Sequence, residues 1–259
     1  MFTLQRARAK AGDAGAELPN PFRRLAREGV GFRRGELSLI AAGPGVGKSA
    51  IALRLAVEAK VSTLYFSADS DAAIQYERAA AMLSGREMHE IAAMVESGDT
   101  RYLDSKLAGL RKLRWNFDSS PSLDLIEANV KSWAYVYGNY PELIVVDNVG
   151  DVSPDVEDGG HIGLENVMSY LADLARQTTA HVCALHHLTG EYDDGTQPPP
   201  LSALKGKISK KPALVLNLFR PDVGKLGVVI GKNRHGRPDV GNQYRVTLNS
   251  DLARMLITD

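Results

Sequence analysis

The stretch LSLIAAGPGVGKSA, residues 37–50, decides the fold predicted for this chain. Residues 37–42 are apolar enough for a buried strand, and residues 49–59 (SAIALRLAVEA) have the apolar spacing of a helix. A glycine-rich turn between a strand and a helix directs backbone N–H groups inward, beside the positive end of the helix dipole. This arrangement binds phosphate groups, so the sequence predicts a phosphate-binding loop.

Each residue of this loop has an expected task in binding ATP and Mg²⁺. Lys48 is expected to reach the β- and γ-phosphates, and Ser49 to bind the metal. The strict pattern of such loops has glycine where this chain has Ala42, a departure of one methyl group. The alternative is a glycine-rich turn with an incidental Lys-Ser pair, which leaves the flanking strand and helix unexplained. The predicted nucleotide-binding residues are Gly43, Pro44, Gly45, Val46, Gly47, Lys48, Ser49 and Ala50.

Apolar strands and amphipathic helices alternate through the rest of the chain. Further strands are predicted at 62–66, 113–117, 143–147 and 181–185, and further helices at 72–83, 123–135 and 163–178. Beyond the prolines at 198–200, the pattern predicts four short strands at 213–219, 225–231, 242–248 and 252–258. The expected fold is α/β, a mainly parallel twisted sheet flanked by helices, with antiparallel C-terminal strands. Residues 1–30 are expected to form an arm or linker, and residues 31–259 one ATPase domain.

The composition excludes several classes of protein. The 259 residues are 44% hydrophobic and 24% charged, which is typical of a globular chain. Lys and Arg number 31 and so do Asp and Glu, which excludes a uniformly basic, histone-like coat. Cys183 is the single cysteine and therefore forms no internal disulfide. Since no signal-peptide pattern and no apolar run of ~20 residues occurs, the sequence predicts a cytoplasmic protein without a membrane partner.

The charges are unevenly distributed along the chain. Residues 132–175 contain eight acids and no Lys or Arg, whereas residues 205–237 contain nine bases and one acid. This pattern predicts one surface for a cation and another for a polyanion, although mutual neutralisation across a subunit contact remains an alternative. The long loop at 189–211 has no aromatic side chain among its lysines, so we expect binding to a nucleic-acid backbone without sequence preference. Its candidate DNA-binding residues are Lys205, Lys207, Lys210 and Lys211.

Polar residues follow three of the predicted strands. Asp147 ends strand 143–147 and is expected to hold Mg²⁺ together with Ser49. Asp69 follows strand 62–66 and is the candidate for activating the attacking water, although Asp69, Ser70 and Asp71 are also suited to cap the next helix. His187 is expected to sense the γ-phosphate. His181 is interpreted as a structural residue.

Taken in order, these motifs resemble the RecA-like ATPase core of hexameric replicative helicases of the DnaB type. The similar segments are FRRGELSLIAAGPGVGKSA (32–50), YFSADSDAAIQYERAAAML (65–83), PELIVVDNVGDV (141–152) and GKNRHG (231–236). The resemblance implies that Asp69 is the catalytic acid, that Asp147 ends the Walker B strand, and that His187 is the sensor. The segment LSALKGKISKKPALVL (201–216) resembles the family's loop that lines a central DNA channel and the strand after it. Lys232 and Arg234 would then reach the nucleotide of the neighbouring subunit.

The leading functional hypothesis is an ATP-driven translocase or helicase that acts on single-stranded or forked DNA. It would work as a homo-oligomer, a hexameric ring with ATP between subunits. Two other hypotheses stay open. One is a metal-dependent nuclease specific for forked or junction DNA, with the acids Asp147, Asp151, Asp155, Glu157 and Asp158 holding two metal ions. The other is a recombination ATPase that forms filaments.

Overall fold

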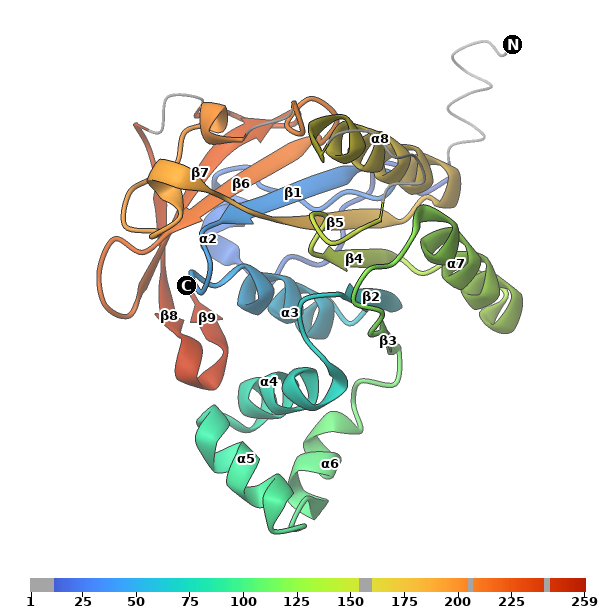
Figure 1. The fold of residues 1–259 in the computed structure, drawn as a ribbon, viewed down its shortest axis with the longest axis vertical. Coiled ribbons are helices and arrows are strands. Elements are labelled where there is room, and N and C mark those ends of the chain that lie inside the picture. Colours follow the sequence, from blue (N-terminus) through green and yellow to red (C-terminus); the bar gives the residue numbers. More distant parts are fainter. Residues whose placement is uncertain (1–11, 154–159, 205–206, 240–242) are drawn as a thin grey trace.

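A single twisted sheet organises the chain in the computed structural model, which describes residues 12–153, 160–204, 207–239 and 243–259. The described strands form a nine-stranded sheet in the order β3-β2-β4-β5-β1-β6-β7-β8-β9 (Figure 1). The first six strands in that order run parallel; they are β1 (Leu37–Ala42), β2 (Thr63–Ser67), β3 (Leu113–Asn116), β4 (Leu143–Asp147), β5 (His181–His187) and β6 (Leu214–Phe219). The antiparallel edge consists of β7 (Lys225–Asn233), β8 (Val246–Asp251) and β9 (Leu256–Thr258). The predicted α/β fold class is confirmed.

Helices cover both faces of the sheet, as the predicted strand and helix order requires. On one face lie α2 (Arg23–Arg27) and α3 (Lys48–Glu58), and on the other lie α7 (Leu123–Tyr137) and α8 (Gly160–Thr178). Alternate residues of β1 pack against the helices on the two faces of the sheet, because successive side chains along a strand point to opposite faces. Ile40 and Ala42 pack with α3, whereas Leu39 and Ala41 pack with α7 and α8. A strand buried on both faces is continuously apolar, which explains the LSLIAA pattern.

Three helices between β2 and β3 form a small lobe at one end of the molecule (Figure 1). They are α4 (Ala72–Ser84), α5 (Met88–Glu96) and α6 (Arg101–Leu107), and their own small core contains Ala80, Ala81, Ile91 and Leu103. The sequence predicts only the first of them. The other two are short, and α5 begins with an unusual capping box in which Glu87 replaces the common Ser or Thr.

The last two strands differ from the prediction. Strand β8 begins at Val246 and runs on to Asp251, and residues 252–254 form a 3₁₀ turn before β9. The Asp251 side chain accepts a hydrogen bond from the backbone N–H of Arg254, and Met255 has a φ of 54°. The Asp251 cap begins the turn and the left-handed Met255 ends it. The apolar run LARMLIT is therefore divided into a turn and a three-residue strand.

The segment up to residue 30, which the sequence predicts to be an arm or linker, contributes to the core. Leu18, Phe22, Leu25 and Val30 are buried in the same cluster as α3. The Leu18 N–H donates to the Phe32 carbonyl at 2.8 Å, which fixes the segment against the start of the domain. The segment expected to be an arm therefore packs into the domain from Leu18 onward, because its four apolar side chains are buried against the cluster that contains α3.

This packing predicts a large cost for truncating Phe22, whose side chain is fully buried. Phe22→Ala is expected to lower the free energy of unfolding by about 3–5 kcal/mol, since a buried ring is lost and a cavity remains. Chemical denaturation measures the change. Val223→Ala is the matched control, because Val223 is 96% exposed and its truncation should leave the unfolding curve unchanged. A Phe22→Ala protein as stable as the original would mean that this segment is an independent arm.

Candidate nucleotide-binding site

The predicted phosphate loop joins the end of β1 to the first residue of α3. Gly45 has a φ of 67° and Gly47 a φ of 126°. Both values lie in a region that residues with a Cβ rarely adopt, so the turn depends on these two glycines. Gly47 is also the N-cap residue of α3. The backbone N–H groups of the first helical turn are therefore presented at the mouth of the loop.

Lys48 is the first residue of α3 and is almost fully buried, with 4% of its surface exposed. Its ammonium Nζ donates to the carbonyls of Ala42 and Gly43, both at 3.2 Å, and lies 3.0 Å from His187 Nδ1. Burial lowers the pKa of Lys48 to about 8, although the charges of Asp147 and Asp69 act in the opposite direction. The acceptors around the ammonium are thus neutral. The negatively charged oxygens of a triphosphate would be stronger acceptors in their place.

Asp147 ends β4 and is 2% exposed. The Tyr65 hydroxyl donates to its Oδ2 at 3.0 Å, whereas its Oδ1 is buried without a hydrogen-bond partner among the described residues. Burial raises the pKa of Asp147, while the hydroxyls of Ser49 and Tyr65 lower it. A buried carboxylate oxygen without a partner, next to a serine hydroxyl, is a donor set suited to a hard cation. The residues present therefore fit the Mg²⁺ ion that the resemblance implies.

Asp69 and His187 complete one wall of the same site. The Asp69 side chain is 48% exposed, and its Oδ2 lies 4.0 Å from His187 Nε2. Burial and the nearby Lys48 ammonium lower the pKa of His187 and thereby favour its neutral form. A neutral imidazole that accepts from the Lys48 ammonium at Nδ1 has one N–H, at Nε2, which can donate to an anion. The neighbouring His186 is more deeply buried, which lowers its pKa to about 4.

The structure brings four sequence-predicted residues, Lys48, Ser49, Asp69 and His187, into one pocket of about 220 Å³. Asp147 is not among the lining residues but lies near Lys48, since its charge acts on the Lys48 pKa. Pro44 and Val46 belong to the same phosphate loop. The full lining is Gly45, Gly47, Lys48, Ser49, Ala50, Asp69, Arg78, Met88, His187, Leu252 and Met255.

Asp71, rather than Asp69, caps α4. Its side chain accepts a hydrogen bond from the Ile74 N–H at 2.9 Å. The competing interpretation, that Asp69 is an N-cap, is therefore wrong, and the Asp69 carboxylate is left to face the pocket. The role of Asp69 in catalysis stays a prediction.

A polar network next to Asp69 is not predicted by the sequence. Arg78 Nη1 donates to Ser70 Oγ at 3.0 Å, Ser67 Oγ donates to the Ser70 carbonyl at 2.6 Å, and Gln75 Nε2 donates to Ser67 Oγ at 2.9 Å. These bonds fix the turn that carries Asp69, and Arg78 also lines the pocket. The available signal was the pair of polar residues Gln75 and Arg78, one helical turn apart, on a helix otherwise rich in alanine.

A second segment that sequence analysis missed lies against the phosphate loop. A Cβ added at Gly43 would come within 2.1 Å of the Asp193 carbonyl oxygen, and one at Gly195 within 2.2 Å of Val46 Cγ2. Arg220, which follows β6, donates from Nη2 to the Gly45 carbonyl at 2.9 Å. The start of the long loop after β5, at Asp193 and Gly195, therefore packs directly against the phosphate loop.

The predicted finger residues lie away from this pocket. Lys232 and Arg234 come from the end of β7, and neither is among the described residues that line the pocket of their own chain. The Lys232 ammonium donates to the carbonyls of Ser209 and Lys210, and Arg234 Nη2 donates to the Lys211 carbonyl at 3.3 Å. Among the candidate DNA-binding residues, Lys207, Lys210 and Lys211 are exposed, and Lys205 lies outside the described residues.

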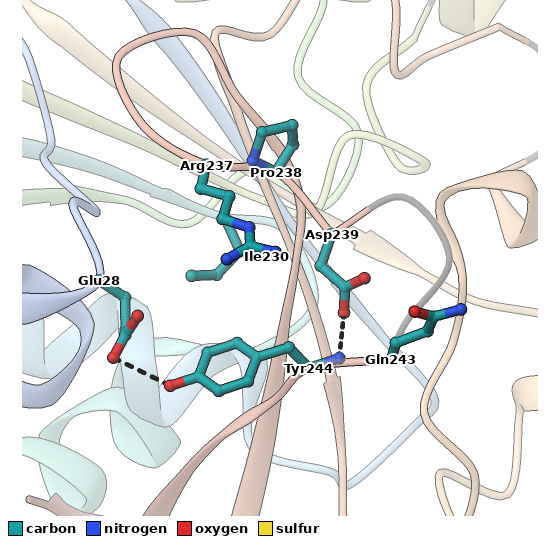
Figure 2. Close-up of a pocket in the computed structure, with 7 residues that line it drawn as sticks. All are labelled: Glu28, Ile230, Arg237, Pro238, Asp239, Gln243 and Tyr244. Carbon is teal, nitrogen blue, oxygen red and sulfur yellow. Dashed lines mark hydrogen bonds between the residues drawn. The ribbon is translucent and has the colours of Figure 1, made fainter.

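A larger cavity of about 430 Å³ lies between α2 and the connection from β7 to β8 (Figure 2). Its lining residues are Glu28, Ile230, Arg237, Pro238, Asp239, Gln243 and Tyr244, none of which belongs to the phosphate loop. The Tyr244 hydroxyl donates to Glu28 Oε1 at 2.9 Å, and the Tyr244 N–H donates to Asp239 Oδ2 at 2.6 Å. Glu28 and Asp239 thus both bond Tyr244, and none of the lining residues of this cavity is one that the sequence predicts to bind nucleotide.

The other sequence expectations have mixed outcomes. His181 is buried and bonded through both ring nitrogens, to Ser38 Oγ and the Arg33 carbonyl at 2.9 Å each, as expected of a structural residue.

In the part of the chain that the structure describes, no three His, Cys, Asp or Glu residues are grouped to hold a metal ion. Of the acids in the nuclease hypothesis, Asp155, Glu157 and Asp158 lie outside that part. No helix among the described residues is long and apolar enough to span a bilayer.

Solved structures with the same fold include helicase and recombinase domains. A structure described as an ATPase domain has a TM-score of 0.83 at 19% identity and covers 99% of this chain and 95% of its own. A DnaB-like replicative helicase, described together with its interactions with primase, has a TM-score of 0.82 at 19% identity over all of this chain and 67% of its own. The RadB recombinase has a TM-score of 0.63 at 18% identity and covers 93% of this chain and 99% of its own.

Relatives by sequence come from bacteriophages. The Gene 65 protein of Mycobacterium phage L5 is 39% identical over all of this chain and 99% of its own length. The Gene 65 protein of Mycobacterium phage D29 is 41% identical over 80% of this chain and 92% of its own length. The model of the DnaB-like helicase C-terminal domain matches residues 17–252. With a phosphate loop, a buried strand-end aspartate and this sheet order in place, the chain belongs to the DnaB-like helicase C-terminal domain family.

Proposed function

We propose that this chain hydrolyses ATP with Mg²⁺ at the phosphate-loop pocket and uses the energy to move along single-stranded or forked DNA. The observation that carries the proposal is the meeting of a buried ammonium (Lys48), a buried carboxylate oxygen without a partner (Asp147) and an exposed carboxylate (Asp69) at one end of the sheet. These groups suit a phosphate chain, a divalent cation and an attacking water, respectively.

Each residue has a distinct task in this proposal. The loop N–H groups and Lys48 bind the phosphates, and Ser49 and Asp147 hold the Mg²⁺ ion, which neutralises charge that develops on the phosphate oxygens. Asp69 orients the attacking water and accepts its proton, and the network through Ser70 and Arg78 keeps the carboxylate in place. His187, neutral and next to Lys48, donates a hydrogen bond to the γ-phosphate.

Among the described residues that line the pocket, the cations are Lys48 and Arg78, and Arg78 donates to Ser70 Oγ. A further cation for the γ-phosphate would come from outside the pocket. Arg234 is exposed at the end of β7, and its planar, permanently charged guanidinium suits two phosphate oxygens. We therefore assign it to the pocket of a neighbouring copy, which makes the active species a closed ring, and we take that ring to be hexameric as in DnaB-type helicases. The exposed lysines of residues 207–211 would contact the DNA backbone.

The lowered pKa of Lys48 predicts a pH dependence of nucleotide binding. Bound phosphates favour the ammonium form, so binding takes up a proton once the pH exceeds the free-state pKa of about 8. The affinity for a nonhydrolysable ATP analogue should therefore fall as pH rises above 8, by up to about tenfold per pH unit. Equilibrium titrations between pH 7 and 10 measure it. The Lys48→Arg variant keeps its charge throughout, so whatever affinity it has should not vary with pH. Constant affinity in the unmodified protein would contradict the assignment.

Mixing two inactive variants tests the assignment of Arg234 to a neighbouring pocket. Lys48→Ala removes the phosphate contact, and Arg234→Ala removes the finger but leaves nucleotide binding intact, so each alone should lose nearly all ATP hydrolysis. In an equal mixture, about a quarter of the interfaces would pair an intact pocket with an intact finger, and hydrolysis should reappear to that extent. Arg237→Ala, three residues further along, is the control and should retain activity. A mixture as inactive as its components would place Arg234 outside the neighbour's pocket.

Replacing three loop lysines tests the DNA part of the proposal. With Lys207, Lys210 and Lys211 changed to Ala, binding of a single-stranded oligonucleotide should weaken. The slope of log K against log salt should become shallower by about two, since each phosphate contact contributes about 0.7 for a single strand. ATP binding should stay unchanged. The control, Lys131→Ala on α7, should keep the original slope. An unchanged slope in the triple variant would place the DNA elsewhere on the protein.

A further inference from the structure

The basic loop, residues 207–211, has a defined backbone. Ile208 is fully buried in the cluster that includes α8, while Lys207, Lys210 and Lys211 are exposed. Lys207 has a φ of 57°, and the Lys210 N–H donates to the Lys207 carbonyl at 3.0 Å. A non-glycine residue adopts such a φ only where surrounding contacts hold it. Some group outside the loop must therefore fix its backbone.

Lys232 supplies two such contacts, in addition to the ion pair of Lys210 Nζ with Glu165 Oε1 at 3.5 Å. Its ammonium Nζ donates to the Ser209 carbonyl at 2.8 Å and to the Lys210 carbonyl at 2.9 Å. Hydrogen bonds from a charged donor are stronger than neutral ones, and two of them converge here on adjacent residues of the loop. Partial burial and the charge of Arg234 lower the pKa of Lys232. Arg234 makes a longer bond of 3.3 Å, to the Lys211 carbonyl, from an exposed side chain.

A bulge in β7 directs Lys232 toward the loop. Leu216 lies opposite Ile230 and Val215 lies opposite Lys232, so Gly231 is an additional residue without an opposite partner. Ile230 packs in the cluster with α3, and strict alternation would place Lys232 on that same face. The additional residue reverses the alternation. Lys232 instead shares the face of Val215, which packs in the same cluster as Ile208 of the loop.

We propose that Lys232 is a positioning residue for the basic loop: its two hydrogen bonds fix the loop backbone so that Lys207 and Lys211 are presented to DNA. The DNA part rests on the proposed function. This role is distinct from the finger role that the sequence predicts for Lys232, which stays a prediction. Arg234, with one long and exposed bond, remains the finger. The end of β7 thus joins the DNA loop to the ATP of the adjacent copy.

Limited proteolysis of the intact chain tests the positioning role without DNA or ATP. In Lys232→Met, which keeps the apolar stem and loses the ammonium, trypsin should cleave after Lys207 and Lys210 about fivefold faster than in the unmodified protein, as expected when hydrogen bonds of ordinary strength are lost. Lys232→Arg should restore protection, because a guanidinium can also donate to two carbonyls. Lys225→Met is the control on the same strand, since the exposed Lys225 side chain bonds only the Asn249 side chain among the described residues. Thermal unfolding verifies that each variant is folded. Cleavage of folded Lys232→Met at the original rate overturns the proposal.

Salt titrations of oligonucleotide binding separate positioning from direct contact. Lys232→Met should weaken binding severalfold while the slope of log K against log salt stays the same, because the loop lysines still neutralise the same phosphates. A slope shallower by about 0.7 would mean that Lys232 itself contacts a phosphate, which overturns the positioning role. If neither the variant nor the unmodified chain binds DNA, the proposed function fails, and the cleavage rates still decide what Lys232 does.

Discussion

The burial of the Lys48 ammonium is the constraint on which the site depends. A charged amine removed from water is costly, and here two carbonyls, an imidazole nitrogen and the charges of Asp147 and Asp69 offset part of that cost. Asp147, equally buried, keeps one carboxylate oxygen without a hydrogen-bond partner among the described residues. A nucleotide and its metal ion would satisfy both groups at once. The free protein therefore has a site whose polar groups are positioned before the ligand arrives, which is how binding sites reduce the entropy that binding costs.

The parallel sheet makes this arrangement possible. Strands β2, β4, β5 and β1 are adjacent, and all four run in the same direction. Their carboxyl ends carry Asp69, Asp147, His187 and the phosphate loop, in that order. In the register of the sheet, Ser67 lies opposite Asp147 and Ala42 lies opposite His187. Residues more than 130 positions apart, such as Lys48 and His187, thus come within hydrogen-bond distance without help from a ligand.

The antiparallel edge has a different task. It holds Arg234, which we propose to act in the pocket of a neighbouring copy, and it provides the contacts of Lys232 with the basic loop. A ring ATPase needs its DNA contacts and its interface cation to respond to each other, and placing both at the end of one strand is a short route for that coupling. The bulge at Gly231 separates the two roles, since it places Lys232 on the side of the loop.

The sequence by itself determined the alternation of strands and helices in the α/β core, the phosphate loop and the residues at the strand ends, because these depend on local periodicity and on glycine conformation. It also indicated Asp69, although Asp71 competed for the cap. Only the tertiary structure decided the rest. Burial of Leu18 and Phe22, the support of Asp69 by Arg78, and the bonds of Lys232 to Ser209 and Lys210 depend on segments brought together from distant parts of the chain. Side-chain periodicity places a residue on a face of a strand, but a single bulge reverses that face, and the bulge is a property of the pairing between strands.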